Sequence, residues 1–239
     1  MWFLDLTLET PAANLALDEA LLEDAELDES PREVLRVWES ASPMVVLGRS
    51  SQIQNEVRID RCREMGIPIV RRASGGATIL TGPGCLMYAV VLSYQLRPQL
   101  RMLDVAHRTV METHQAAISS LGIGCKIQGI CDLTLNGKKF SGNSLRCRRS
   151  HLIYHGTLLY DFELTMIEQC LGDPIRKPEY RQSRSHLDFL TCLPVGRESL
   201  IKALRDVWWA NDSPFQWPQE LTEKLAREKY ESSEWTNRH

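Results

Sequence analysis

The chain has 239 residues, of which 43% are hydrophobic and 25% charged. This length and composition predict a folded protein with one large domain, or one domain with a small appendage, and exclude a disordered or fibrous chain. The formal net charge of −3 provides no broad positive field, so we do not expect nucleic acid as a partner.

The first third of the sequence predicts short strands around one long helix. Residues 1–8 alternate apolar and polar side chains as a strand does. Thr10 followed by Pro11 is typical of a helix start, with an N-cap and then a proline in the first turn. A loop is expected at 23–32. Further strands are expected at 34–38, 44–47, 67–70 and 86–92, with a short helix at 59–65 that ends at Gly66.

Residues 74–84 are rich in glycine and predict a loop that crosses between two strands. Residues 103–121 predict the longest helix, ended near Gly122. Asn136-Gly137 is the strongest two-residue hairpin signal in the chain. Beyond the long helix, strands are expected at 126–130, 133–135 and 152–160, and helices at 166–171, 199–209 and 218–230.

The predicted strands come in hairpin clusters rather than in alternation with helices. This order favours an α+β fold with a mixed, largely antiparallel central sheet flanked by helices. The longest apolar run, 85–92, is far shorter than the roughly 20 residues that span a bilayer, so we expect no membrane partner. The acidic N-terminus is unlike a secretory leader and favours a cytoplasmic location. Seven cysteines without a CxxC pair predict reduced thiols rather than disulfides or a zinc site.

The most informative segment is Arg-Arg-Ala-Ser-Gly-Gly-Ala-Thr at 71–78, directly after a predicted strand. No P-loop, GxGxxG, GxSxG or HExxH motif is present in the sequence. Adjacent glycines let a ligand approach the backbone, and arginines offer forked donors to phosphate or carboxylate. An anion site is therefore one interpretation, and a tight turn with two solvated arginines is the other.

Two later segments add candidate groups. In the hairpin at 132–142, one of Lys138 and Lys139 should face solvent and the other the interior, because side chains alternate along a strand. An inward ammonium is acceptable if a ligand supplies negative charge, although an ordinary basic hairpin is the alternative. His155, in the third segment, is by itself more typical of a satisfied core residue than of a catalyst.

The order and spacing of three segments resemble the lipoate-protein ligase and octanoyltransferase family, relatives of the biotin ligases. The segments are RRASGGATI at 71–79, DLTLNGKKFSG at 132–142 and YHGTLL at 154–159. The resemblance begins near Asn14, passes through 47–49, Gln52 and 56–57, and continues to about Leu159, more weakly to Leu193. It implies that family's α+β sheet, with the acyl chain in a tunnel beside the sheet and the adenylate under the glycine-rich loop. It also implies a catalytic domain at 1–198 and a C-terminal helical extension at 199–239 packed on the same domain. That extension is too short for the accessory domain many ligases carry.

The resemblance assigns roles to individual residues. The RRxSGG motif falls on Arg71, Arg72, Ser74, Gly75 and Gly76, and the family's lysine falls on Lys139. In a ligase the acyl carboxylate attacks the α-phosphorus of ATP, and a fixed ammonium beside both groups stabilises the transition state. Further substrate or adenylate contacts are implied at Ala77, Asp132, Ser141, Gly142, His155, Gly156 and Thr157.

The sequence also departs from the ligase pattern RRxSGGGxVxHD. Ala77 replaces the third glycine, Thr81 the histidine and Gly82 the aspartate, and Gly-Pro-Gly at 82–84 is similar to octanoyltransferases that use no ATP. Cys131 lies where ligases usually carry asparagine. A thiol whose pKa is lowered by a nearby ammonium could form an acyl-thioester, so Cys131 is a second catalytic candidate. An inert buried cysteine is the alternative.

The sequence therefore predicts an enzyme that attaches lipoate or octanoate to a lysine of a lipoyl carrier domain, through an acyl-adenylate formed from ATP with Mg²⁺. The resemblance implies carriers among 2-oxoacid dehydrogenase or glycine cleavage proteins, and a separate accessory subunit if adenylation needs one. No residue is assigned to the metal. The alternatives are ATP-independent transfer through a thioester, a non-catalytic lipoate-binding relative, and biotin transfer, which the Arg-Arg-x-Ser-Gly-Gly order disfavours.

Overall fold

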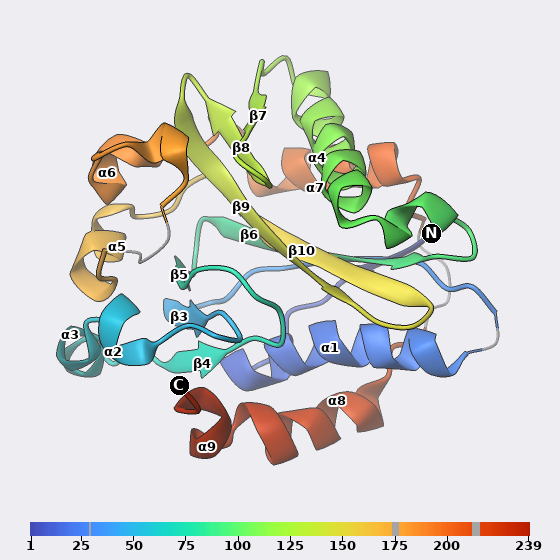
Figure 1. Cartoon of the computed structure of the whole chain (residues 1–239), viewed down its shortest axis with the longest axis horizontal. Coiled ribbons are helices and arrows are strands. Elements are labelled where there is room, and N and C mark those ends of the chain that lie inside the picture. The colour runs from blue at the N-terminus through green and yellow to red at the C-terminus, as the bar shows by residue number, and fades with distance from the viewer. Residues whose placement is uncertain (29, 174–176, 212–215) are drawn as a thin grey trace.

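The computed structural model describes residues 1–28, 30–173, 177–211 and 216–239. Its centre is a seven-stranded sheet in the order β1-β2-β6-β10-β9-β8-β7 (Figure 1). Strand β1 pairs with β2 in parallel, and every other neighbouring pair of this sheet is antiparallel. The expected α+β fold with a mixed, largely antiparallel sheet is confirmed. The strands are β1 (Trp2–Asp5), β2 (Val34–Trp38), β6 (Cys85–Ser93), β7 (Lys126–Gln128), β8 (Asp132–Leu135), β9 (Lys138–Cys147) and β10 (His151–Leu159).

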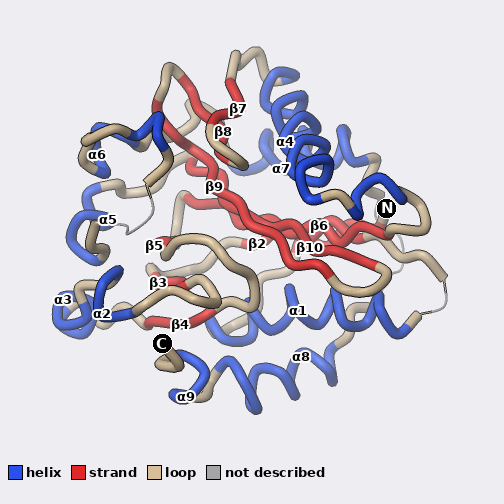
Figure 2. The backbone as a smooth tube through the Cα atoms, viewed as in Figure 1, coloured by secondary structure: helices blue, strands red, loops and turns tan. Residues whose placement is uncertain are grey.

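Helices cover both faces of this sheet (Figure 2). The long helix α4 and α7 pack on one face, and α1 packs on the other, with α8 beyond it (Figure 1). All nine residues of β6 are buried as a result, which explains its unbroken apolar sequence. The helices longer than six residues are α1 (Pro11–Leu27), α4 (Leu103–Ser120), α7 (Arg197–Trp208) and α8 (Gln219–Leu225).

A three-stranded sheet of order β4-β3-β5 lies beside the main sheet. It packs with short helices in its own apolar cluster. Its strands are β3 (Met44–Leu47), β4 (Ile69–Arg71) and β5 (Ile79–Thr81), and the remaining short helices are α2 (Ile53–Glu56), α3 (Ile59–Glu64), α5 (Thr165–Cys170), α6 (His186–Phe189) and α9 (Ser233–Thr236). Single turns occur at η1 (Pro98–Arg101), η2 (Glu179–Arg181) and η3 (Ala226–Tyr230).

Several local predictions are confirmed. The Thr10 side chain caps α1 by accepting a hydrogen bond of 3.1 Å from the Ala13 amide. Asn136 and Gly137 both have positive φ, 51° and 76°, as a tight hairpin turn requires. Gly66 and Gly122 also have positive φ where the two predicted helices end. No helix among the described residues is long and apolar enough to cross a bilayer.

Several elements differ from the prediction. Helix α1 continues to Leu27, five residues into the expected loop at 23–32, because Ala25 is buried and Glu26 accepts hydrogen bonds from 149–151. The glycine-rich segment 74–84 contains a strand, β5, which pairs with β3. The predicted helix at 218–230 changes to a π-helical turn after Leu225.

A buried ion pair joins the N-terminal helix to the sheet. The guanidinium of Arg36, on β2, is fully buried and lies 2.5 Å from the carboxylate of Asp18, on α1. Burial raises the pKa of Asp18, but Arg36 and His155 more than offset this, so its pKa lies below the usual value. Asp18 therefore stabilises the fold above its unfolded pKa of about 3.9, and this contribution is lost as the pH falls through the lower folded value.

We expect Asp18→Asn to lower the free energy of unfolding by about 3 kcal/mol near pH 7, because Arg36 stays buried without its counter-ion. The loss in free energy of unfolding should become smaller as the pH falls below about 4, because Asp18 in the wild type is then protonated. Urea unfolding across this pH range measures it, with Asp60→Asn, in an exposed pair on α3, as the control. A deficit that is constant with pH would show that the ion pair is not its cause.

Candidate active site

The glycine-rich loop at 72–78 lies directly against the backbone of the segment that follows β3. The Arg49 amide donates to the Ser74 carbonyl at 2.8 Å. A Cβ at Gly48 would lie 1.9 Å from the Gly76 carbonyl oxygen, so only glycine allows this contact. Gly75, Gly76 and Ala77 are themselves exposed, which leaves the tip of the loop accessible.

The two arginines of the motif hold the loop through backbone carbonyls. Arg71 donates to Gly48 at 2.7 Å, Ser51 at 2.8 Å and Thr236 at 2.7 Å. Arg72 donates to the carbonyls of 46, 75 and 77. Burial lowers the pKa of Arg72 to about 10, so it stays charged at neutral pH. Their donors are therefore largely committed to the protein, and Arg71 lines neither of the two cavities described below.

Ser74 is tied to the main sheet through a buried polar chain. Its Oγ lies 2.5 Å from Nε2 of His155 on β10, and Nδ1 of His155 lies 3.4 Å from the Asp18 carboxylate. The order of groups is that of a Ser-His-Asp triad. However, Ser74 is only 2% exposed and does not line either main cavity. These three hydrogen-bonded side chains therefore anchor the glycine-rich loop rather than presenting a nucleophile.

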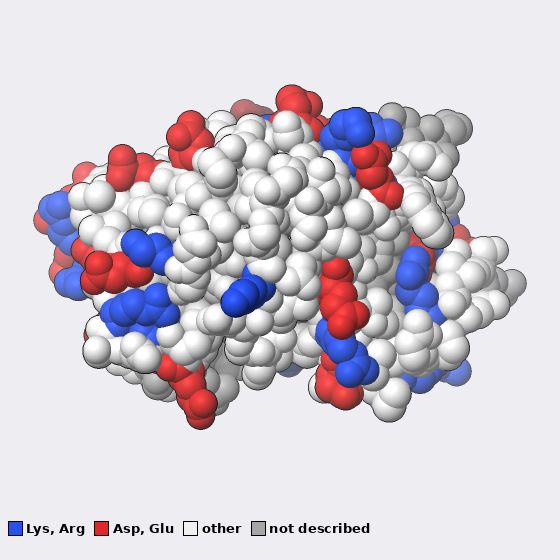
Figure 3. Space-filling model, turned by 90° about the horizontal axis from the view of Figure 1, so that it is seen from above, with Lys and Arg blue, Asp and Glu red and all other residues white. Residues whose placement is uncertain are grey.

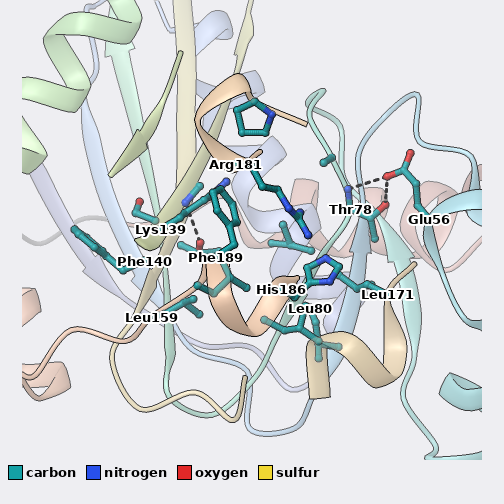
Figure 4. A pocket seen from close by; sticks show the side chains of 18 of the residues that line it. Glu56, Thr78, Leu80, Lys139, Phe140, Leu159, Leu171, Arg181, His186 and Phe189 are labelled. Atoms are coloured by element: carbon teal, nitrogen blue, oxygen red, sulfur yellow. Dashed lines mark hydrogen bonds between the residues drawn. The ribbon is translucent and has the colours of Figure 1, made fainter. Parts of the chain in front are cut away.

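Two cavities meet at Lys139. The first, which we call the α1 cavity, has a volume of about 390 Å³, within the usual range for ligand sites. The second, the η2 cavity, measures about 150 Å³ (Figure 4). Both are lined by Ala77, Ile79, Lys139, Gly142 and Pro178. The glycine-rich loop and the hairpin therefore converge on one crevice.

The predicted residues divide between these cavities. The α1 cavity is lined by Arg72, Gly76, Cys131, Asp132, His155 and Gly156, together with the aliphatic side chains of Leu15, Val46, Met87 and Ile130. The η2 cavity is lined by Ser141 and Thr157, together with Glu56, Thr78, Leu80, Phe140, Leu159, Leu171, Arg181, His186 and Phe189. Ser74 and Gly75 lie outside both linings.

Lys139 is the inward member of the lysine pair, as expected, since Lys138 is exposed and the Lys139 side chain is 26% exposed. Its Nζ lies 2.8 Å from the Asp132 carboxylate. A Cβ at Gly142 would lie 2.6 Å from this Nζ, so the glycine leaves room for the ammonium. The other Asp132 oxygen accepts a hydrogen bond of 2.7 Å from the Tyr180 hydroxyl.

Cys131 borders the α1 cavity but is not activated. Its thiol donates to the Asn143 carbonyl at 3.0 Å. Burial and the charge of Asp132 raise the pKa of this thiol, and Lys139 offsets only part of the increase. Lys139 does lower the pKa of this thiol, as expected, but burial outweighs it, so the net pKa is raised and the expectation of a thiolate favoured by the ammonium is wrong. The role of Cys131 as a nucleophile stays a prediction.

We expect iodoacetamide at pH 7.5 to label Cys147, which is exposed, well before Cys131, because alkylation requires an accessible thiolate. Peptide mapping by mass spectrometry over a time course measures the two rates. Equal labelling, or faster labelling of Cys131, would contradict the raised pKa.

Glu56 and most of the wall formed by 177–190 were not assigned to the site from the sequence, although Glu56 lies within the family resemblance. The Glu56 carboxylate accepts hydrogen bonds from the Thr78 amide at 3.0 Å and its hydroxyl at 2.7 Å (Figure 4). The segment 174–184 is rich in arginine and contains two prolines, and 174–176 lie outside the described residues. The arginines that follow a proline at 178 were the available signal.

The face shown in Figure 3 is mostly uncharged, and its charged groups are mixed in sign. In the view of Figure 3, lysine and arginine side chains lie in small groups beside acidic ones. This agrees with the net charge of −3. The cavities, rather than a charged face, are therefore the features that point to a ligand.

A family profile described as the lipoyl protein ligase A/B catalytic domain matches residues 10–193. The chain belongs to this family. Its curated relatives are named as enzymes of two kinds. A probable lipoate-protein ligase A of Mycoplasma pneumoniae is 28% identical over 68% of this chain and 46% of its own length. An octanoyltransferase LipM of Carboxydothermus hydrogenoformans is 26% identical over 98% of this chain and 97% of its own. The chain thus spans about half of the first relative and nearly all of the second.

Solved structures show the same family fold. A bi-partite lipoate protein ligase from Thermoplasma acidophilum, described with its E2 lipoyl domain, superposes with a TM-score of 0.83 at 20% identity, over 99% of this chain and 95% of that chain. A lipoate-protein ligase A bound with ATP superposes with a TM-score of 0.78 at 21% identity, over 99% of this chain and 98% of that chain. At these identities the likeness shows the fold alone.

Proposed function

We propose that the protein attaches lipoate or octanoate to a lysine of a lipoyl carrier domain, through an acyl-adenylate made from ATP. The observation that carries this proposal is the position of Lys139, where its ammonium borders both cavities. An acyl chain in one cavity and a nucleotide in the other can therefore meet at the Lys139 ammonium. The catalytic unit is residues 1–198, with 199–239 as an extension of it.

The acyl chain fits the α1 cavity, because Leu15, Val46 and Met87 offer it aliphatic surface. The nucleotide fits the η2 cavity, where the hydroxyl of Thr78 can hydrogen-bond and the ring of Phe189 offers a flat apolar face. The carboxylate end of the chain and the α-phosphate then meet beside Lys139. Solved relatives by fold are described as bound to lipoic acid and to ATP, which supports this ligand pair.

The first step is attack of an acyl carboxylate oxygen on the α-phosphorus, with cleavage of the bond to pyrophosphate. Both reactants are anions, so the Lys139 ammonium reduces their repulsion and stabilises the transition state. Mg²⁺ usually takes one or two carboxylates and completes its shell with phosphate oxygens and water. Asp132 is the carboxylate beside Lys139, but its oxygens already contact Lys139 Nζ and the Tyr180 hydroxyl, and the described residues include no group of three or more His, Cys, Asp or Glu that could hold a metal ion. The ion would therefore be held mainly by the phosphates of ATP, to which it would supply further positive charge.

In the second step the amine of the carrier lysine attacks the acyl carbonyl, AMP leaves and the amine loses a proton. The mixed anhydride also reacts with water, so the walls of the crevice must limit its access. A lipoyl carrier domain of a 2-oxoacid dehydrogenase or glycine cleavage protein is the proposed partner, with a separate accessory subunit where adenylation requires one. The bi-partite relative by fold is described together with an E2 lipoyl domain.

The test combines the purified protein with an apo carrier domain and follows the carrier mass. Lipoate or octanoate should modify the carrier only when ATP and Mg²⁺ are added. Modification by an octanoyl thioester without ATP, lost in Cys131→Ala, would instead establish thioester transfer, which Gly82-Pro83-Gly84 favours. Tight binding of lipoate without modification by either donor would establish a non-catalytic relative.

A further inference from the structure

Arg181 has a donor that the protein leaves unused. It lies in η2, its side chain lines the η2 cavity, and the residue is only 4% exposed. Its Nε donates to the Arg184 carbonyl at 3.2 Å. Its Nη2 is buried, and no hydrogen-bond partner for it exists among the described residues. A buried donor without a partner is costly, so such an atom at a cavity wall points to an absent acceptor.

The neighbouring arginines do not share this feature. Arg184, three residues later, donates to the carbonyls of Gly137 at 2.8 Å and Tyr180 at 2.5 Å. Arg72, which lines the α1 cavity, likewise donates to backbone carbonyls. Arg184 and Arg72 therefore hold loops in place, whereas Arg181, which lines the η2 cavity, has a buried Nη2 with no hydrogen-bond partner among the described residues.

The surroundings hold Arg181 in position. Its guanidinium stacks over the ring of Phe189, with 5.0 Å from Cζ to the ring centroid, and in Figure 4 it extends toward Thr78 and His186. The preceding residue, Tyr180, donates to Asp132, the carboxylate that also pairs with Lys139. The turn is thus tied to the reacting end of the crevice, and the guanidinium is preorganised for a ligand.

Glu56 does not neutralise this cation, although it lines the same cavity. Its oxygens accept hydrogen bonds from Ser51, Gln52 and Thr78, and no ion pair joins it to Arg181. The η2 cavity is therefore lined by two cations: Lys139, which pairs with Asp132, and Arg181, whose Nη2 has no hydrogen-bond partner among the described residues. The largest charge interaction of Arg181 with a carboxylate is with Asp173.

We propose that Arg181 binds an anionic phosphate oxygen of the nucleotide in the η2 cavity, as a second cationic contact beside Lys139. This rests on the proposed function and extends it, because a fatty acyl chain carries one anionic group whereas a nucleotide adds phosphates. A planar guanidinium suits such oxygens better than an ammonium does. Arg181 would therefore set the preference of the cavity for a phosphate-bearing ligand.

The test measures binding of ATP, AMP and lipoate by titration calorimetry to the full chain and to Arg181→Gln, Arg181→Lys and Arg184→Gln. Arg181→Gln should weaken ATP and AMP about 10- to 100-fold, the range of a charged hydrogen bond, and change lipoate affinity less than about twofold. Arg181→Lys should have a nucleotide affinity between those of the wild type and Arg181→Gln. It replaces Arg181→Gln in the comparison if the glutamine variant fails to fold. Arg184→Gln, which removes a loop contact in the same segment, should weaken the nucleotides less than about threefold.

Equal loss in Arg181→Gln and Arg184→Gln would overturn the proposal, since packing of the segment would then explain both. Unchanged nucleotide affinity in a folded Arg181→Gln would overturn it as well. If the wild-type chain binds neither ATP nor AMP, the adenylate mechanism itself fails. That result is distinct from a wild-type chain that binds nucleotide without help from Arg181.

Discussion

Replacing Lys139 by methionine should reduce acyl transfer by about 100- to 1000-fold, the usual effect of removing one group that stabilises a transition state. The ammonium is the cation common to both cavities, and methionine keeps most of its length without the charge. Thermal stability should change little, because the lost ion pair with Asp132 is partly solvated. Single-turnover modification of an apo carrier, followed by mass spectrometry at saturating substrate, measures the rate.

Lys138→Met is the matched control, because Lys138 is adjacent on β9 and exposed. It should modify the carrier at the wild-type rate. If Lys139→Met stays within a few-fold of the wild type, the ammonium is not the group that stabilises the transition state.

The second large effect is expected from Gly48→Ala, which changes no polar group. The added methyl would lie 1.9 Å from the Gly76 carbonyl oxygen and 3.0 Å from its carbonyl carbon. Both are backbone atoms, so the glycine-rich loop has to move. We expect a cost of about 2 kcal/mol, or a melting temperature lower by roughly 4–8 °C. Acyl transfer should fall by about 100-fold, because a displacement near 1 Å is enough for such a loss.

Gly124→Ala is the control for this substitution, since nothing lies within 4 Å of the Cβ it would add. It should leave both the melting temperature and the rate unchanged. A Gly48→Ala protein with normal activity would show that the loop position does not matter for catalysis.

The hairpin that carries the lysine pair was predictable from the sequence, because a turn and strand alternation depend only on neighbouring residues. Asn136-Gly137 fixes a hairpin by its own backbone preference, so strand alternation predicted that one of Lys138 and Lys139 points inward, and the family resemblance selected Lys139. The convergence of the glycine-rich loop with this hairpin came from the order of the three motifs and their family resemblance. Strand β5 was hidden because it has only three residues beside a run of glycines.

The contacts of the arginines were not predictable, because a sequence does not show which acceptor a long side chain reaches. Arg71 and Arg72 were expected to offer donors to a ligand, but Arg71 donates to the Gly48 carbonyl and Arg72 to the Ala77 carbonyl of its own loop. The role of Arg181 was not predictable either, because only the folded structure shows that its Nη2 has no partner among the described residues. The pKa of Cys131 likewise depends on burial created by the folded chain.

The most direct test of the central claim is a crystal structure of the protein with a non-hydrolysable acyl-adenylate. We expect the acyl chain in the α1 cavity, the nucleotide in the η2 cavity and Nζ of Lys139 within about 3 Å of both the phosphate and the acyl oxygen. A ligand bound away from Lys139, or one confined to a single cavity, would contradict the account.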